Sequence, residues 1–172
     1  MLRIAPGMGE GVRDWGGGEV SMRLGCKRRR MPVTYLEPTD DAGRALMLRG
    51  LKGPVVMLNL LRLKKIADYS ASPELAPSSP VSGAEAFDRY IKHTLPFLNA
   101  SGGELTLLAR GGSFFIGPAD ERWDVAMLVR QSSIDAFIAF ASNTAYRAGL
   151  GHRTAAIEDS RLLPLEPVES LA

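Results

Sequence analysis

The chain has 172 residues, a hydrophobic content of 45%, a charged content of 23% and a formal net charge of +2, as in an ordinary soluble globular protein of about one domain. It has no apolar run of about 18 residues that could span a membrane. The single cysteine, Cys26, excludes an intramolecular disulfide and a cysteine-based metal site. These features suit a cytoplasmic protein.

The positive charge is concentrated at the start of the chain. Residues 1–30 contain seven Lys or Arg and three Asp or Glu, whereas residues 31–172 contain fourteen and sixteen. The body is therefore slightly acidic and lacks the basic surface of a nucleic-acid-binding protein. Residues 1–30 are rich in glycine and predict a disordered basic tail. A binding arm, or an upstream stretch before a true start at Met31, are the alternatives, and residues 31–172 form the expected domain.

The first elements of this domain can be predicted from caps and hydrophobic periodicity. Thr39 is placed to cap a helix over 40–49, and Gly50 can close it. The run 54–63 is apolar at both odd and even positions, which indicates a strand covered on both faces.

A loop over 67–83 separates this strand from a long helix. Ser82 and Glu85 form a capping-box pattern that begins a helix over 83–100. Pro96 lies inside this helix and is expected to kink or divide it.

The sequence pattern in the second half of the chain predicts further strands and helices with glycine-rich turns between them. In chain order, the expected elements are strands at 105–110, 113–116 and 123–131, helices from Ser132 and over 144–159, and an edge strand at 161–167 that contains Pro164.

The order of elements is β-α-β-β-α-β with one helix in front. It predicts an α+β fold of the ferredoxin-like type, in which both helices cover one face of a four-stranded antiparallel sheet. The strands at 54–63 and 123–131 are apolar on both faces, so the second face would expose a large apolar patch on a monomer. We therefore expect a homodimer in which two sheets face each other, a dimeric α/β barrel.

Several sequence blocks carry a resemblance to a known family. The segments YIKHTLPF, LLARGG and AYRAGLGHRTAAIEDSRLLP, in this order, resemble the family named domain of unknown function 1330, in the dimeric α/β-barrel superfamily. GPVVMLNLLRL and ERWDVAMLVR resemble its longer-chain branch, which also has the front helix. The resemblance covers roughly residues 33–165. It implies the fold and the dimer but no catalytic residues, because the activity of that family is uncharacterised.

The haem-degrading members of this superfamily are similar in having an asparagine on the first strand, with a tryptophan and a histidine on the last helix. Asn59 matches the asparagine, but the stretch 137–153 has no tryptophan and His152 comes late in it. We therefore expect no haem and no other cofactor. The two histidines are far apart in the sequence, and no local metal-binding motif exists.

Asn59 is the polar residue in the apolar strand at 54–63, and it shares a face with Val55, Met57 and Leu61. A buried amide needs hydrogen-bond partners. Either a backbone group at the sheet edge or across the dimer provides them, or a ligand does so in the cleft between sheet and helices.

His152 and Arg153 are the candidate catalytic residues. A neutral histidine can act as a general base near neutral pH, and an arginine can hold a carboxylate. Because they are adjacent on a helix, at most one points fully inward. Asp159 is expected on the same helical face as His152 but two turns away. In the alternative without catalysis, Arg153 pairs with an acidic group and His152 lies half-exposed at the surface.

The other candidate ligand-binding residues are Arg110, Trp123 and Tyr146. Arg110 precedes a Gly-Gly pair that permits close approach of the backbone, Trp123 begins a strand, and Tyr146 belongs to the blocks that carry the resemblance. His93 is expected in solvent, off the apolar face of its helix.

These residues are compatible with two functions. The first is a cytoplasmic dimer that binds a small organic molecule, for example an acid, in a cleft and that could act as a cofactor-independent enzyme. The second is a non-catalytic interaction module with a packed barrel. An inward-facing cluster of Asn59, Arg153 and His152 would favour the first, and a cavity filled by side chains the second.

Overall fold

The computed structural model describes residues 33–170, which lie within one compact unit. The predicted basic tail at 1–30, with Cys26, lies outside the described residues. Its disorder and the proposed start at Met31 therefore stay predictions.

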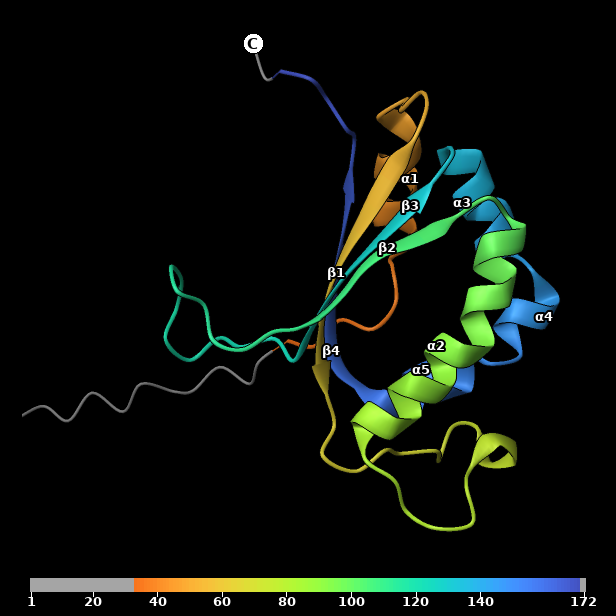
Figure 1. The fold of residues 1–172 in the computed structure, drawn as a ribbon, viewed down its shortest axis with the longest axis vertical. Helices are drawn as coiled ribbons and strands as arrows, with labels where there is room; N and C mark the ends of the chain where they lie inside the picture. Colours follow the sequence, from red (N-terminus) through yellow and green to blue (C-terminus); the bar gives the residue numbers. More distant parts are fainter. Residues whose placement is uncertain (1–32, 171–172) are drawn as a thin grey trace, which may run out of the picture. The chain divides into compact units, whose positions relative to one another are not determined.

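The described residues form one four-stranded antiparallel sheet with helices on one face (Figure 1). The strand order is β2-β3-β1-β4, and the strands are β1 (Val55–Leu63), β2 (Glu104–Arg110), β3 (Val125–Gln131) and β4 (Ile157–Leu165). The helix α2 (Gly83–Ala100) follows β1, and α3 (Ile134–Ala141), α4 (Thr144–Arg147) and α5 (Leu150–Ala156) follow β3. This topology is the predicted ferredoxin-like fold.

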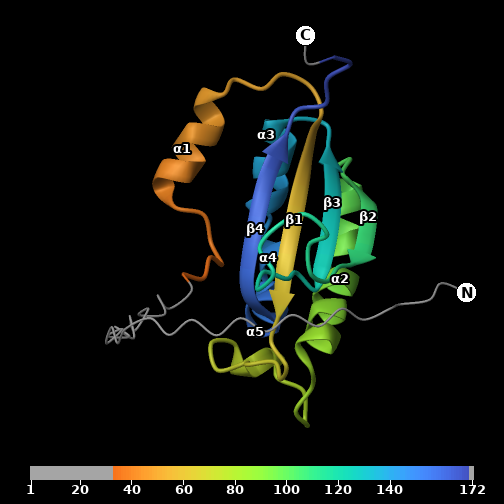
Figure 2. The ribbon, with the colours of Figure 1, turned by 90° about the vertical axis from the view of Figure 1, so that its left-hand side faces the viewer.

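The helix α1 (Asp40–Leu48) precedes the sheet and lies beside β4 (Figure 2). The Thr39 hydroxyl accepts a hydrogen bond from the Ala42 amide at 3.1 Å, and Gly50 adopts a positive φ of 58° just after the helix. The prediction of this helix is therefore confirmed. The chain before α1 runs along the edge of β4, where the Tyr35 carbonyl accepts hydrogen bonds from the Ser160 amide and hydroxyl at 2.9 and 2.6 Å.

The long helix α2 begins at the predicted capping box. The Glu85 amide donates to the Ser82 hydroxyl at 3.1 Å, while the Glu85 carboxylate accepts from the Ser82 amide at 2.9 Å. Of the two predicted effects of Pro96, division of the helix does not occur, because α2 continues to Ala100. A short 3₁₀ helix, η1 (Pro73–Leu75), lies in the loop before α2.

Two predicted elements are wrong. The stretch 113–116 is not a strand, because its apolar side chains have no sheet beside them and only one isolated bridge, between Ser113 and Arg122, forms there. The helix predicted over 144–159 is broken into α4 and α5, and the strand β4 begins at Ile157. Gly149 lies at the break, packed against the ring of His93 so closely that a Cβ would come within 2.1 Å of it.

The two faces of β1 have different surroundings. Val55, Met57 and Leu61 on the helix side are 0 to 1% exposed and lie in the hydrophobic core. Val56, Leu58 and Leu60 lie on the opposite face and are only half-buried. By register, this outer face also includes Leu128, Leu163 and Leu165 from the neighbouring strands. The described part of the chain thus leaves one apolar sheet face uncovered.

Gly83 and Gly43 provide a matched test of the contact between α2 and the sheet. A Cβ at Gly83 would lie 2.3 Å from the backbone oxygen of Lys64 and 2.8 Å from that of Ala156. We expect Gly83→Ala to lower the free energy of unfolding by about 1 to 3 kcal/mol, because backbone atoms must shift. Gly43, inside α1, has open space around it, and Gly43→Ala should stabilise by about 0.5 to 1 kcal/mol. Urea unfolding of both variants measures this. A neutral Gly83→Ala would contradict the packing described.

Candidate functional site

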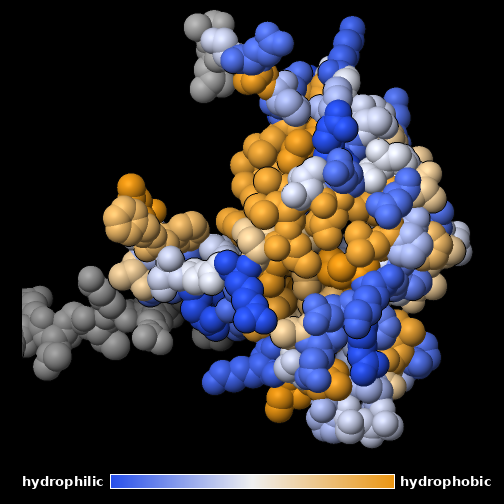
Figure 3. Space-filling model, viewed as in Figure 1, coloured by the Kyte–Doolittle hydropathy of each residue, from blue (hydrophilic) through white to orange (hydrophobic). Residues whose placement is uncertain are grey.

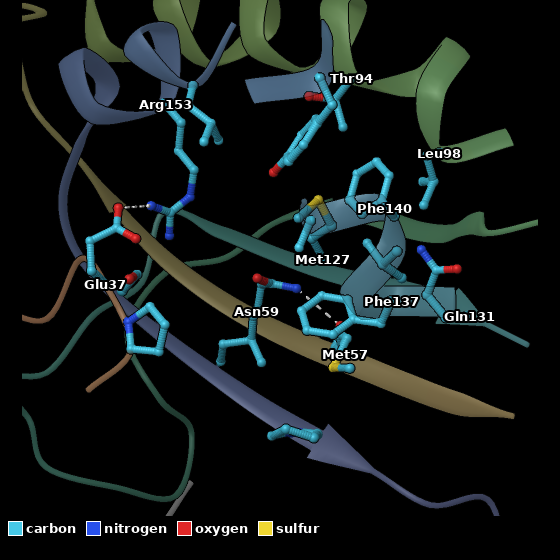
Figure 4. A pocket seen from close by; sticks show the side chains of 18 of the residues that line it. Glu37, Met57, Asn59, Thr94, Leu98, Met127, Gln131, Phe137, Phe140 and Arg153 are labelled. Carbon is cyan, nitrogen blue, oxygen red and sulfur yellow. Dashed lines mark hydrogen bonds and ion pairs between the residues drawn. The ribbon is translucent and has the colours of Figure 1, made fainter. Parts of the chain in front are cut away.

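A cavity of about 730 Å³ lies between the sheet and the helices. Figure 4 shows side chains from both layers pointing into it. Most of the lining is apolar, including Met57, Leu98, Met127, Phe137 and Phe140. Its volume and composition are those of a pocket for a small organic molecule.

Asn59 points from β1 into this cavity (Figure 4). Its side-chain amide nitrogen donates to the Met57 carbonyl oxygen at 3.0 Å. Because a carbonyl can only accept, this bond fixes the orientation of the amide and turns Oδ1 away from Met57. No hydrogen bond to Oδ1 is found among residues 33–170. The cavity therefore contains an oriented acceptor on its sheet side.

Two tyrosines add a donor on the helix side. The hydroxyls of Tyr90 and Tyr146 are 3.0 Å apart, and both residues line the cavity. Burial, followed by the neighbouring Tyr90, raises the pKa of Tyr146 above its ordinary value. Tyr146 therefore stays neutral near pH 7. One hydroxyl donates to the other, so the proton of the accepting hydroxyl is left for a further bond.

Arg153 lies at one end of the cavity, near the chain before α1. Its Nη1 donates to the Leu36 carbonyl oxygen at 3.0 Å and lies 3.6 Å from Glu37 Oε1. The side chain of Arg153 is 19% exposed and that of Glu37 is 75% exposed, so solvent weakens the ion pair. Arg147 is the other cation of the lining, and Glu37 is its single carboxylate. The lining thus has a net charge of +1.

Two further polar side chains in the lining were missed at the sequence level. Gln131 is 0% exposed and Thr94 is 7% exposed. In the part of the chain that the structure describes, no partner is found for either amide atom of Gln131 or for the Thr94 hydroxyl. Gln131 ends an apolar strand, as Asn59 interrupts one, and this shared pattern could have identified it. Leaving such groups unpaired lowers stability.

His152 does not line the cavity, although it is next to Arg153 in the sequence. Its Nδ1 lies 2.9 Å from the Tyr69 hydroxyl, in the loop after β1. Burial, followed by the charges of Arg89 and His93, lowers the pKa of His152 below its ordinary value. The structure thus brings Asn59 and Arg153 to one cavity and leaves His152 outside it.

Asp159 and His93 also differ from expectation. Asp159 lies on β4 rather than on a helix, and its carboxylate accepts from the Tyr35 amide at 2.8 Å and from Arg161 at 2.6 Å. His93 is only partly in solvent, and its Nε2 lies 3.0 Å from the carbonyl oxygens of Ala145 and Tyr146.

Arg110 and Trp123 lie away from the cavity. Arg110 is exposed at the end of β2. Trp123 is 3% exposed, and the guanidinium groups of Arg62 and Arg161 lie 5.3 and 5.1 Å from its ring centre. Because Arg62 and Arg161 point to the outer face of the sheet, Trp123 is a packing residue of that face.

No group of three or more His, Cys, Asp or Glu side chains within residues 33–170 is arranged to hold a metal ion. None of the helices in this range is long and apolar enough to cross a bilayer.

The fold and the site define a ferredoxin-like α+β protein with an apolar cavity between sheet and helices. The chain is similar to RPA0582, a protein of unknown function from Rhodopseudomonas palustris. Its match to the crystal structure of methylated RPA0582 has a sequence identity of 31% and a TM-score of 0.71, and it covers 81% of this chain and 98% of that one. A second RPA0582 structure matches at 31% identity and a TM-score of 0.69, over 80% of this chain and 100% of that one. The chain belongs to the family of RPA0582.

A dimeric protein of unknown function with a ferredoxin-like fold, from Bacteroides fragilis, is more distant, at 12% identity and a TM-score of 0.41 over 66% of this chain and 95% of that one. No protein-family model and no curated protein matches the chain. Its membership of the domain of unknown function 1330 family therefore stays a prediction.

The unpaired groups of Gln131 and Thr94 can be tested by near-isosteric substitution. Gln131→Met and Thr94→Val remove polar atoms that have no partner and keep the shape of the side chain. We expect each to raise the free energy of unfolding of the ligand-free protein by about 1 kcal/mol. Urea unfolding measures this. A loss of stability in both variants would mean that these groups are paired in the free protein.

The environment of His152 predicts a dependence of stability on pH. Its pKa is lowered in the folded state, so the unfolded chain binds more protons below the ordinary value of 6.5. The stabilising contribution is complete above that pH and is lost as the pH falls through the lower folded-state pKa. We expect the stability difference between wild type and His152→Gln to shrink from pH 7.5 to pH 5.5. Urea unfolding at both pH values measures this, and a constant difference would contradict it.

Proposed function

We propose that the protein is a homodimer that binds a small, largely apolar organic molecule in the cavity between sheet and helices. The observation that carries this proposal is the Asn59 carbonyl oxygen, which points into an apolar cavity with its amide nitrogen already bonded to Met57. An oriented acceptor in an apolar site is how binding pockets select one orientation of a ligand.

The lining specifies the chemistry of the ligand. The body of the ligand is apolar, since methionine, leucine and phenylalanine side chains surround most of the space. A hydroxyl or N–H group of the ligand would donate to Asn59 Oδ1, and an acceptor would receive the remaining tyrosine proton of the Tyr90 and Tyr146 pair. An acidic group is favoured at the end of the cavity that holds Arg153, because the lining has a net positive charge.

The described residues support binding more than proton transfer. The lining includes no histidine, and its carboxylate, Glu37, is largely exposed to water. The raised pKa of Tyr146 suits a hydrogen-bond donor and not a general base near neutral pH. His152, the expected base, faces Tyr69 instead.

The alternative of a packed interaction module is less well supported. It would require the space between sheet and helices to be filled, as in an ordinary close-packed core. A volume of about 730 Å³ is left between these layers.

The homodimer is supported by the outer face of the sheet. Val56, Leu58 and Leu60 alternate with the core residues of β1, and Leu163 beside them is 53% exposed. An apolar sheet face of this kind is unusual on a monomer, and a second copy covers it by two-fold symmetry. A cytoplasmic location, with neither membrane nor nucleic acid as a partner, remains our expectation from the sequence.

Leu162 and Leu163 allow a matched test of the cavity. They are neighbours on β4 with similar exposure, 48% and 53%, but Leu162 lines the cavity and Leu163 lies on the outer face. Leu162→Trp would place a larger side chain in the cavity, and Leu163→Trp would leave the cavity unchanged. With the neutral fluorescent probe N-phenyl-1-naphthylamine, we expect Leu162→Trp to weaken binding by at least about tenfold, which is about 1.4 kcal/mol. Leu163→Trp should change it by less than about twofold.

Fluorescence titration of the full chain gives both constants, and native mass spectrometry of the purified protein shows whether a dimer carries an additional mass. Equal affinity in wild type and Leu162→Trp would mean that the probe binds elsewhere. Absence of saturable binding together with absence of a bound mass would count against the cavity as a binding site.

A further inference from the structure

The loop between β2 and β3 carries three consecutive large apolar side chains in solvent. Phe114, Phe115 and Ile116 are 42%, 102% and 87% exposed. We call residues 111–122 the β2–β3 arm. Figure 3 shows the hydrophobic end of the arm standing away from the rest of the described chain. Such exposure is unfavourable in water unless something covers it.

The base of the arm is held firmly. The Gly111 amide donates to the Asp124 carbonyl at 2.9 Å, and the Trp123 amide donates to the Gly112 carbonyl at 3.0 Å. The two segments at the base of the arm thus continue the pairing of β2 and β3. A Cβ at Gly111 would lie 2.3 Å from the Trp123 carbonyl oxygen, so this position requires glycine. Trp123 itself is fixed between Arg62 and Arg161 on the outer face.

The end of the arm has a defined turn of its own. The ring of Phe114 packs on Gly117, where a Cβ would come within 2.8 Å of the Phe114 side chain. The Glu121 amide donates to the Pro118 carbonyl oxygen at 3.2 Å. Phe115 and Ile116 are thus presented on a folded turn, which reduces the entropy lost when a partner binds them.

The arm leaves the sheet on the side opposite the helices. In Figure 1 it extends away from the sheet while α2 and α5 lie on the other side, and in Figure 2 it lies in front of the strands. This side is the uncovered apolar face that includes Leu58 and Leu163. A molecule that covers the face therefore meets the arm as well.

We propose that the β2–β3 arm is a dimerisation element, in which Phe115 and Ile116 dock on a second copy of the chain. A second copy of the chain is the partner that fits the arm. The arm is continuous with the outer face of the sheet, which is buried in the homodimer that we propose above. By two-fold symmetry each protomer extends one arm across its partner, which doubles the contribution of every apolar contact. This inference rests on the homodimer and adds the arm to its interface.

The test is sedimentation equilibrium of the full chain over a dilution series. The double variant Phe115→Ser and Ile116→Ser removes the apolar end of the arm and leaves its base intact. We expect its dimer dissociation constant to be at least about tenfold higher than that of wild type, because buried apolar anchors dominate interface energies. Ile66→Ser is the matched control: Ile66 is 66% exposed but lies outside the outer face and the arm, and its variant should stay within about twofold.

The outcomes separate the arm from the dimer. A double variant that dimerises as tightly as wild type overturns the role of the arm and leaves the homodimer standing. A wild-type chain that stays monomeric at all concentrations overturns both. Binding of wild type, but not of the double variant, to phosphatidylcholine vesicles with unchanged dimerisation would identify a lipid surface as the occupant and overturn the inference. Probe binding in the cavity should be equal in wild type and double variant, which verifies that the protomer is folded.

Discussion

The architecture depends on a central strand that is apolar on both faces. In β1, Val55, Met57 and Leu61 need one cover and Val56, Leu58 and Leu60 need another. Helices α2 and α5 cover Leu61 on one side of the sheet. On the same side, Ile134 and Phe137 of α3 and Leu46 of α1 pack against Val55 and Met57. The ferredoxin-like topology places every helix after β1 on this side, so none of the helices within residues 33–170 covers the second face. The apolar outer face and the direction of the arm both follow from this constraint.

The helix layer covers the sheet without filling the space beneath it. The contacts are closest where α2 begins, since the Gly83 backbone packs directly on Lys64 and Ala156. Farther along the helix, Thr94 and Leu98 face a cavity of about 730 Å³. Keeping such a space open, with the unpaired amide of Gln131 at its wall, lowers the stability of the empty protein. A cost of this kind is typical of binding sites, where a ligand offsets it.

Local sequence patterns were enough to predict the positions of some candidate residues but not of others. The parity of β1 placed Asn59 on a buried face, and the structure has it there, because side chains in a strand alternate regardless of the rest of the fold. His152 and Arg153 were expected to point in different directions, and they do. Arg153 faces the cavity from α5, which begins after the break at Gly149, and Gly149 packs on His93, more than fifty residues away. At the base of the β2–β3 arm, Trp123 likewise packs against two arginines from other strands.

The sequence by itself determined the order of elements, the caps at Thr39 and Ser82, and the two apolar faces of the central strand. These features depend on neighbours within one turn of helix or along one strand, so they can be inferred from spacing. Only the tertiary structure decided that a cavity remains, that Asn59 turns its carbonyl oxygen into it, and that Gln131 lies unpaired beside it. Each of these depends on distances between segments far apart in the chain, which are fixed only when the layers pack together.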